Sequence, residues 1–195
     1  MMAEATNHYF KHLGVSDGLS QVCIPSIYQD ELGAVWLGTT EGLNRYNGKD
    51  VRVFQPSESN HGLTNNEINE LCGDKNGRMY IRSGNDLIKL DIYTEQFTCL
   101  RQKGVYGLFC KKDTLWVSCA DGIYYYTGQG TELTFFARVQ KGFVGRALYV
   151  DKETVWVVTR KYLVAISRED PLRQEILLTL DKGNCILGDS SGNIW

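Results

Sequence analysis

Short apolar runs alternate with short polar turns along almost the whole chain, and residues 27–46 show the pattern most clearly. Apolar residues lead into the polar turn 30–33, Trp36 lies in the next apolar run, and Leu43 opens a third run that ends at Tyr46. Short runs rich in β-branched and aromatic residues, separated by Gly, Asp and Asn, are typical of β-strands joined by tight turns. The pattern predicts four strands, at 22–29, 34–39, 43–46 and 51–55.

The same arrangement recurs along the chain. An aromatic residue begins the second strand of each repeat, at Trp36, Tyr80, Trp116, Trp156 and Trp195, with separations of 44, 36, 40 and 39 residues. Seven positions after each of the first four comes an aliphatic residue: Leu43, Leu87, Ile123 and Leu163. This constant inner spacing indicates that strand and turn lengths are fixed within the repeat while the outer connections vary.

Repeats of about 40 residues that hold four antiparallel strands are typical of the blades of a β-propeller. One such sheet cannot bury both faces alone, whereas neighbours stacked in a ring bury the faces and protect the edges. We therefore predict an all-β fold, a β-propeller built of four-stranded antiparallel blades that is incomplete in this chain. The five repeat aromatics are interpreted as packing residues between blades, not as a cofactor-binding or sugar-binding cluster.

The two ends of the chain suggest how the repeats are arranged. Residues 9–13 and 18–20 resemble 51–54 and 62–64, an aromatic run before a crossing that ends in Gly-Leu-Ser/Thr. The fifth repeat stops within its second strand, so we expect a partial propeller that forms a homodimer or joins further blades of a longer parent chain. The predicted segments are a disordered or vector-derived stretch at 1–7, the outer strand of a closing blade at 8–19, blades at 20–62, 63–104, 105–142 and 143–182, and an incomplete fifth blade at 183–195.

Three repeats carry the turn Asp-x-x-Gly, which begins at Asp30, Asp74 and Asp189. An aspartate at the start of a turn accepts hydrogen bonds from the backbone of that turn, and the closing glycine can adopt positive φ. A calcium ion needs more oxygen ligands than this motif offers. We therefore expect these aspartates to be structural. The third and fourth repeats replace the motif with Lys-Lys-Asp at 111–113 and Asp-Lys-Glu at 151–153.

Composition narrows the classes of function. The chain has 21 Lys+Arg and 23 Asp+Glu, a net charge of −2, so nothing favours binding of nucleic acid by a basic surface. It has no apolar run long enough to span a membrane, and no membrane contact is expected. Six cysteines without a Cys-x-x-Cys pair, together with three histidines, do not predict a zinc site, and no cofactor is expected. Disulfides are compatible with an oxidising compartment, but the spacing assigns no pairs.

The sequence predicts ligand binding better than catalysis. It contains no Gly-x-Ser-x-Gly, His-Glu-x-x-His or Gly-Lys-Ser/Thr motif, and no catalytic residue is proposed. In a propeller blade, the loops after the second and fourth strands lie on one face. In those loops Arg82, Arg160, Lys161 and Tyr162 are the candidate ligand-binding residues, because such side chains suit hydroxyl-rich ligands. The alternative for each of them is an ordinary solvated loop residue.

Residues 30–48, from the first Asp-x-x-Gly turn to Asn47-Gly48, resemble the two-component regulator propeller repeat. Tyr9-Phe10 and the run Asp17-Gly18-Leu19-Ser20 resemble the start of sensors built from such repeats. The likeness extends from about His8 to the end of the chain, is specific in the first repeat and weakens in the third and fourth.

This resemblance implies the extracytoplasmic part of a hybrid two-component system of Bacteroides-type gut bacteria. Such sensors carry two periplasmic propellers, an immunoglobulin-like domain, one membrane helix, a histidine kinase, a receiver and usually an AraC-type DNA-binding domain. They sense glycan fragments and switch on glycan-utilisation genes. The implied ligand is an oligosaccharide, and the implied location is the periplasm. Residues 1–5 show no signal peptide, so that location would require a leader that this sequence does not show.

Two other functions stay open at this level. The first is a non-catalytic scaffold for protein interactions, although the opening repeat lacks the Gly-His…Trp-Asp pattern of tryptophan-aspartate repeat proteins. The second is a propeller enzyme such as a lyase, which would need an acid–base group on the loop face. The three histidines His8, His12 and His61 do not form such a group on sequence grounds.

Overall fold

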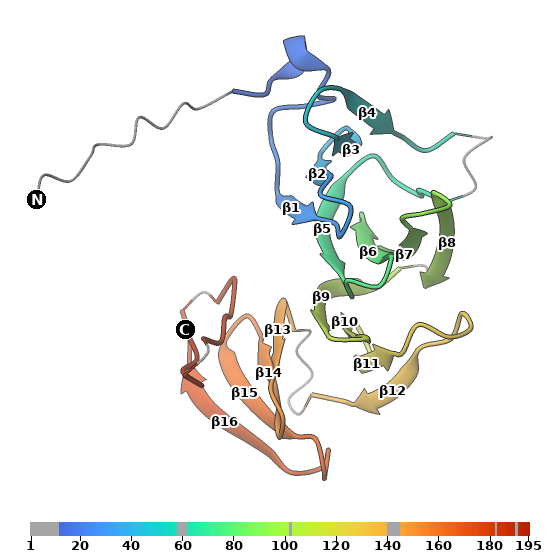
Figure 1. Cartoon of the computed structure of the whole chain (residues 1–195). Helices are drawn as coiled ribbons and strands as arrows, with labels where there is room; N and C mark the ends of the chain where they lie inside the picture. The colour runs from blue at the N-terminus through green and yellow to red at the C-terminus, as the bar shows by residue number, and fades with distance from the viewer. Residues whose placement is uncertain (1–11, 58–61, 102, 140–144, 182, 190) are drawn as a thin grey trace, which may run out of the picture.

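The computed structural model describes residues 12–57, 62–101, 103–139, 145–181, 183–189 and 191–195. Within these residues the chain forms four separate four-stranded sheets and one short 3-10 helix, η1, at Val15–Asp17. Figure 1 shows the sheets following one another around an arc in chain order. The predicted all-β propeller fold with four-stranded antiparallel blades is confirmed.

We number the sheets blades 1 to 4 in chain order. Each is a meander in which strands adjacent in sequence pair antiparallel. Blade 1 contains β1 (Ser26–Gln29), β2 (Val35–Thr39), β3 (Gly42–Tyr46) and β4 (Val51–Phe54). Blade 2 contains β5 (Ile68–Gly73), β6 (Arg78–Ser83), β7 (Asp86–Asp91) and β8 (Gln96–Arg101). Blade 3 contains β9 (Val105–Lys111), β10 (Thr114–Cys119), β11 (Gly122–Tyr126) and β12 (Thr134–Ala137). Blade 4 contains β13 (Ala147–Val150), β14 (Thr154–Val158), β15 (Tyr162–Ser167) and β16 (Gln174–Thr179).

Neighbouring blades meet through their first strands and through a shared apolar layer. Strand β1 lies against β5, β5 against β9, and β9 against β13. Three hydrophobic clusters fill the spaces between successive blades. The first contains Trp36 and Leu43 of blade 1 together with Ile81 and Ile88 of blade 2. The repeat aromatic and the aliphatic residue seven positions later therefore act as one packing unit.

The other two clusters repeat this composition. Tyr80 and Leu87 of blade 2 pack with blade 3 residues, and Trp116 and Ile123 of blade 3 pack with blade 4 residues. Because both members of the unit lie on the face toward the next blade, their spacing fixes how two sheets stack. This explains why the separation of seven residues is constant along the chain.

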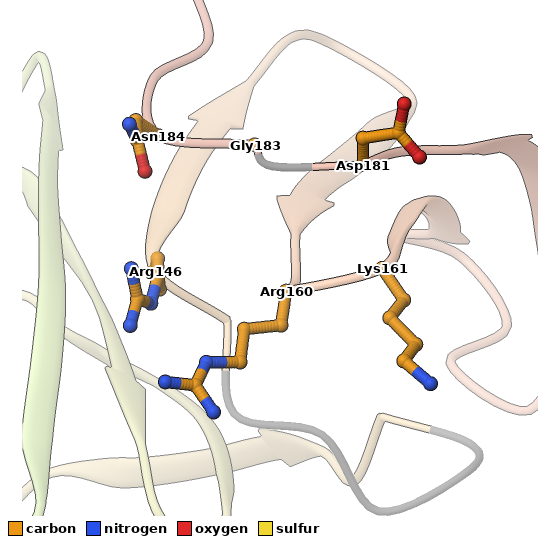
Figure 2. Close-up of a pocket in the computed structure, with 6 residues that line it drawn as sticks. All are labelled: Arg146, Arg160, Lys161, Asp181, Gly183 and Asn184. Atoms are coloured by element: carbon orange, nitrogen blue, oxygen red, sulfur yellow. The ribbon is translucent and has the colours of Figure 1, made fainter.

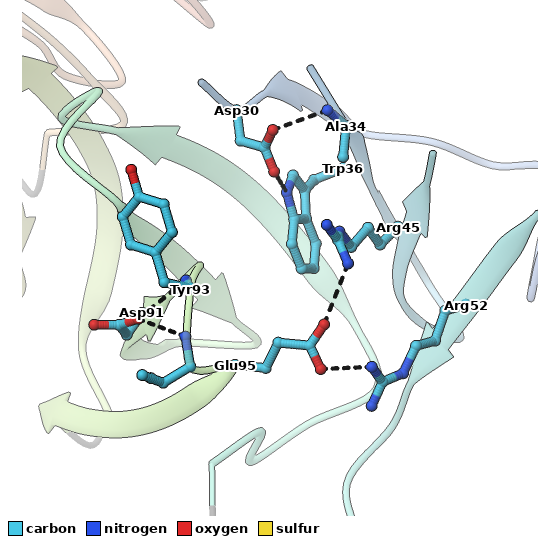
Figure 3. Close-up of polar contacts among 9 residues, drawn as sticks. Asp30, Ala34, Trp36, Arg45, Arg52, Asp91, Tyr93 and Glu95 are labelled. Carbon is cyan, nitrogen blue, oxygen red and sulfur yellow. Dashed lines mark hydrogen bonds and ion pairs between the residues drawn. The ribbon is translucent and has the colours of Figure 1, made fainter. Parts of the chain in front are cut away.

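Asp30 closes the turn between β1 and β2 and also holds the repeat aromatic (Figure 3). Its Oδ1 accepts hydrogen bonds from the backbone N–H groups of Leu32, at 3.0 Å, and Ala34, at 2.8 Å. Its Oδ2 accepts one from the indole Nε1–H of Trp36, at 2.8 Å. Gly33 ends the turn at φ +86°, a conformation that glycine adopts without strain.

The same Asp–Trp link recurs in the later repeats. Asp189 accepts a hydrogen bond from the indole of Trp195 at 3.1 Å, and Asp151 accepts one from Trp156 at 2.7 Å. Asp74 also accepts backbone hydrogen bonds from its own turn. These aspartates are structural, as predicted, and Asp151 keeps the role although its turn lacks the closing glycine.

A charged contact joins the outer parts of blades 1 and 2 (Figure 3). Glu95, in the turn between β7 and β8, pairs with Arg45 at 3.3 Å and also with Arg52 of blade 1. Asp91 shapes that turn by accepting the backbone N–H of Tyr93 at 3.0 Å and that of Thr94. The contact therefore ties a loop of one blade to two strands of its neighbour.

The first strand is shorter than the predicted 22–29, because β1 begins at Ser26. Pro25 has no N–H for a strand ladder and restricts the residue before it. Upstream, the side chain of Gln21 accepts hydrogen bonds from the backbone N–H groups of Val22 and Cys23. These local bonds replace strand pairing over residues 22–25.

The aromatic run 9–13, predicted as the outer strand of a closing blade, lies mostly outside the described residues, and the crossing predicted after it is seen. Residues 8–11 lie outside the described residues, and 12–19 contain the 3-10 helix η1 and no strand. The segment ends against blade 1 itself, where the Ser20 N–H donates to Asn44 at 2.9 Å and the Ser20 and Thr39 hydroxyls lie 2.8 Å apart. These polar contacts direct the chain over the end of blade 1.

The fifth repeat forms a turn with one isolated bridge, between Gly188 and Ile194. Backbone bonds between Leu187 and Trp195, at 2.8 and 3.1 Å, complete this small hairpin. Trp195 is 76% exposed, whereas Trp36 is fully buried. Its expected role in blade packing is therefore not realised among the described residues, because no further apolar layer covers its ring there.

Candidate ligand-binding site

An open pocket lies at one end of blade 4, where three separate segments meet (Figure 2). Arg146 precedes β13, Arg160 and Lys161 form the turn between β14 and β15, and Asp181, Gly183 and Asn184 follow β16. The pocket has a volume of about 310 Å³ and is lined by Arg146, Arg160, Lys161, Asp181, Gly183 and Asn184. Two of the predicted ligand-binding residues, Arg160 and Lys161, are therefore placed together.

The turn that carries these cations is fixed at its base by Thr159, which is buried. The Thr159 hydroxyl accepts the backbone N–H of Tyr162 at 2.9 Å and donates to the Tyr162 carbonyl at 3.1 Å. The carbonyl of Lys161 accepts the Leu180 N–H at 2.6 Å, which ties the turn to the next segment. The backbone is thus held while the side chains of Arg160 and Lys161 project outward.

This hydroxyl recurs at the end of the second strand of every blade. Thr39, Ser83, Ser118 and Thr159 are buried polar residues two or three positions after the repeat aromatic. Ser118, for example, donates to the Gly145 carbonyl at 2.7 Å, immediately before the pocket residue Arg146. Sequence reasoning missed these residues, although a Ser or Thr at a fixed place in the repeat could have revealed them.

The pocket carries more positive than negative charge. Arg146, Arg160 and Lys161 are exposed cations, and Asp181 is the one acid that lines it. In the parts of the chain that the structure describes, none of the three cations makes an ion pair. In Figure 2 the guanidinium groups of Arg146 and Arg160 point the same way, and Lys161 extends on the opposite side. The free donors therefore frame an open space.

The other two predicted residues have different surroundings. Arg82 is engaged within blade 2, where its Nε pairs with Glu70 at 3.3 Å and its Nη1 donates to the Gly84 carbonyl at 3.2 Å. Burial raises the pKa of Glu70, and the charge of Arg82 opposes that effect. Tyr162 is half-buried and packs against the cluster between blades 3 and 4. Neither of them lines the pocket.

An apolar pocket of about 440 Å³ adjoins the polar one and shares Gly183 and Asn184 with it. Leu163, Leu178 and Trp195 are among the apolar residues that line it. It lies between blade 4 and the short hairpin of the fifth repeat. The face of blade 4 that corresponds to the buried faces of blades 1 to 3 is therefore only partly covered here.

The described residues were also compared with the requirements of a metal site and of a membrane-spanning helix. No group of three or more His, Cys, Asp or Glu side chains among them could hold a metal ion. In the same stretches, no helix is long and apolar enough to cross a membrane.

Residues 18–41 match the family described as two component regulator propeller. This stretch of the chain is similar to one two-component regulator propeller repeat. The match includes Asp30, Trp36 and Thr39, which are the turn aspartate, the repeat aromatic and the buried hydroxyl of blade 1. These contacts of blade 1 therefore lie within the matched residues, and the expected resemblance is confirmed.

Comparisons with whole proteins cover very different shares of the chain. Over 55 residues, 28% of this chain, the sequence is 36% identical to histidine kinase P4 of Formosa agariphila. These residues span 4% of that protein. The chain is therefore similar to a short part of a much longer protein.

Solved structures share the fold over most of the chain. The extracellular domain of BT3049, assigned to a hybrid two component system of B. thetaiotaomicron, superposes with a TM-score of 0.79 at 23% identity, over 95% of this chain and 28% of that one. A gluconolactonase of Xanthomonas campestris superposes with a TM-score of 0.62 at 12% identity, over 85% of this chain and 65% of that one. The chain spans less than a third of the BT3049 domain, and the likeness shows the fold alone.

Proposed function

We propose that this chain is the non-catalytic, ligand-sensing propeller segment of a hybrid two-component sensor histidine kinase. Its location is the periplasm, and its ligand is an oligosaccharide whose binding leads to control of glycan-utilisation genes. The two-component regulator propeller repeat and the likeness to the extracellular domain of a two-component system support this proposal. A change in propeller geometry or in dimer packing would carry the signal toward the membrane.

The observation that carries the ligand proposal is the polar pocket of blade 4. Arg146 and Arg160 each offer a planar group of N–H donors, and Asn184 offers an amide with both donors and an acceptor. Sugar hydroxyls both donate and accept, so they suit this mixture of groups. The volume of about 310 Å³ lies at the lower end of the range of small-molecule sites, about 300–1,000 Å³. The pocket fits part of an oligosaccharide whose remainder extends into solvent.

The test is calorimetric titration of the 195-residue chain with a panel of neutral, uronic acid-containing and sulfated oligosaccharides. At least one of them should bind, and Arg160→Ala should weaken that binding about tenfold or more, since a hydrogen bond to a charged group contributes about 1.5–3 kcal/mol. Arg146→Ala should act in the same direction.

Arg173→Ala is the matched control. Arg173 is an exposed arginine of the same blade, in the turn between β15 and β16 at the end remote from the pocket. It should leave the affinity unchanged. A chain that binds no oligosaccharide, or an Arg160→Ala variant that binds as tightly as the wild type, would overturn the proposed site.

A further inference from the structure

Two cysteines meet at the junction of blades 2 and 3. Cys72 and Cys110 are each the second-last residue of the first strand of their blade, β5 and β9. Their Sγ atoms lie 3.0 Å apart, although 38 positions separate the residues in sequence. Both side chains are half-buried and pack against the cluster between the two blades. The contact is thus a tertiary one, made by adjacent first strands of different sheets.

Cys72 departs from the residue type that the other blades have opposite the repeat aromatic. Cys72 pairs with the repeat aromatic Tyr80, and in the other three blades the residue opposite the repeat aromatic is itself aromatic: Tyr28, Phe109 and Tyr149. Phe109 packs on Tyr149 of the next blade, with ring centroids 5.3 Å apart. Blade 2 has a small sulfur-bearing side chain at this position, and its neighbour across the junction is another sulfur.

We propose that Cys72 and Cys110 form a disulfide that cross-links blades 2 and 3 when the chain meets a disulfide oxidant. An S–S bond is about 2.05 Å long, so the two sulfurs need to approach by about 1 Å, which a small rotation of each side chain supplies. Backbone strands already in contact supply the rest of the geometry. The other four cysteines have no second sulfur in hydrogen-bonding contact among the described residues.

The reaction is a two-step thiol–disulfide exchange with an oxidant RSSR. One cysteine thiolate attacks RSSR, which gives a mixed disulfide and releases one RSH after proton uptake. The second cysteine then attacks the protein sulfur of the mixed disulfide and releases the second RSH. In sum, two protein thiols and RSSR give one protein disulfide and two RSH. Burial and the contact with Cys110 raise the pKa of Cys72, so little of this thiol is ionised at neutral pH and the exchange should be faster at higher pH.

The cross-link closes a loop that contains β6, β7 and β8. Constraining a loop of this length in the unfolded chain stabilises the folded state, and we expect the thermal midpoint to rise by about 5–10 °C on oxidation. Because the bond joins two first strands, it also holds the junction between the blades closed. Neither effect depends on the ligand pocket of blade 4.

The test compares the chain treated with oxidised glutathione and the chain kept in dithiothreitol. Free thiols are alkylated under denaturing conditions, and the digested protein is analysed by mass spectrometry without reduction. We expect a linked pair of peptides that contain Cys72 and Cys110 in the oxidised sample, with the thermal midpoint raised. Recovery of both cysteines in alkylated form, or linkage of either one to a different cysteine, would overturn the proposal.

Variants separate this bond from general effects of oxidation. Cys110→Ser should abolish the rise in thermal midpoint on oxidation. Cys23→Ser, which alters an exposed cysteine, should retain both the linked peptides and the rise. If Cys110→Ser does not fold, the peptide map of the wild-type chain still decides the question.

Discussion

The link between Asp30 and Trp36 allows a quantitative test of how the repeat is held together. The variant Asp30→Ala removes the acceptor of two donors that have no access to water, the Trp36 indole N–H and the Ala34 backbone N–H. Each buried donor left without a partner costs about 1–3 kcal/mol. The third donor, the N–H of Leu32, belongs to an exposed residue and can bind water instead. We therefore expect a loss of about 3–4 kcal/mol in the free energy of unfolding.

The assay is urea unfolding followed by far-ultraviolet circular dichroism. The midpoint should fall while the slope stays close to that of the wild type, because the folded structure is retained. In thermal unfolding the same loss corresponds to a decrease of about 10 °C for a chain of this size. Asp30→Asn, which keeps one oxygen acceptor, should cost less than Asp30→Ala.

The fifth repeat offers a matched control within the same molecule. Asp189 makes the same bonds to its turn and to Trp195, but this hairpin is open to water and Trp195 is 76% exposed. Asp189→Ala should therefore not change the free energy of unfolding measurably. A loss below about 1 kcal/mol for Asp30→Ala, or equal losses for the two variants, would refute the reasoning that burial of the donors sets the magnitude.

Three further outcomes test the packing and the charges. Leu43 is fully buried in the first cluster. Leu43→Ala should lower the free energy of unfolding by about 2–5 kcal/mol in the same urea assay. A loss below about 1 kcal/mol would show that the cluster collapses around the gap. Glu95→Gln removes the charge that pairs with Arg45 and Arg52. Because these groups are partly exposed, the variant should lose about 1 kcal/mol or less in the free energy of unfolding, and its stability should depend less on salt. An unchanged salt dependence would count against the contact. Burial alone would raise the pKa of Asp151, but hydrogen bonds from the Trp156 indole and the turn backbone lower it below 3.8. The ionised carboxylate therefore contributes its full stabilisation above pH 3.8. This contribution is lost as the pH falls through the lower pKa of the folded state. The difference in urea midpoint between the wild type and Asp151→Asn should shrink below about pH 4, and a difference that is constant from pH 7 to pH 3 would contradict this.

Local sequence determined the repeat and its strands. The alternation of apolar and polar residues around Trp36 and Leu43 is enough to place β2 and β3, because both strands and their hairpin turn depend on near neighbours. The same holds for the Asp-x-x-Gly turns, whose aspartates bond to backbone groups within four positions. Residues 22–25 form no strand for a local reason as well, since Pro25 has no N–H to donate to a strand ladder.

Tertiary structure decided which residues meet. Arg146, Arg160 and Asn184 lie on three segments and form one pocket only because the ends of β14, β16 and the entry to β13 converge. Sequence grouped Arg82 and Tyr162 with Arg160 because all lie in or beside the same kind of loop, yet Arg82 belongs to another blade and Tyr162 turns to the core. The repeat predicts that these loops share a face, but tertiary contacts decide which of their side chains are free and which are bound within a blade.

The cysteine pair shows the same division. Spacing could not pair Cys72 with Cys110, because a separation of 38 residues fits many arrangements of strands. The contact follows once β5 and β9 lie side by side, and that neighbourhood is set by the apolar layer between blades 2 and 3. Hydrogen bonds within a turn and the alternation of strand residues therefore follow from local sequence. Contacts between blades depend on how the buried faces of neighbouring sheets stack, so they follow only from the tertiary structure.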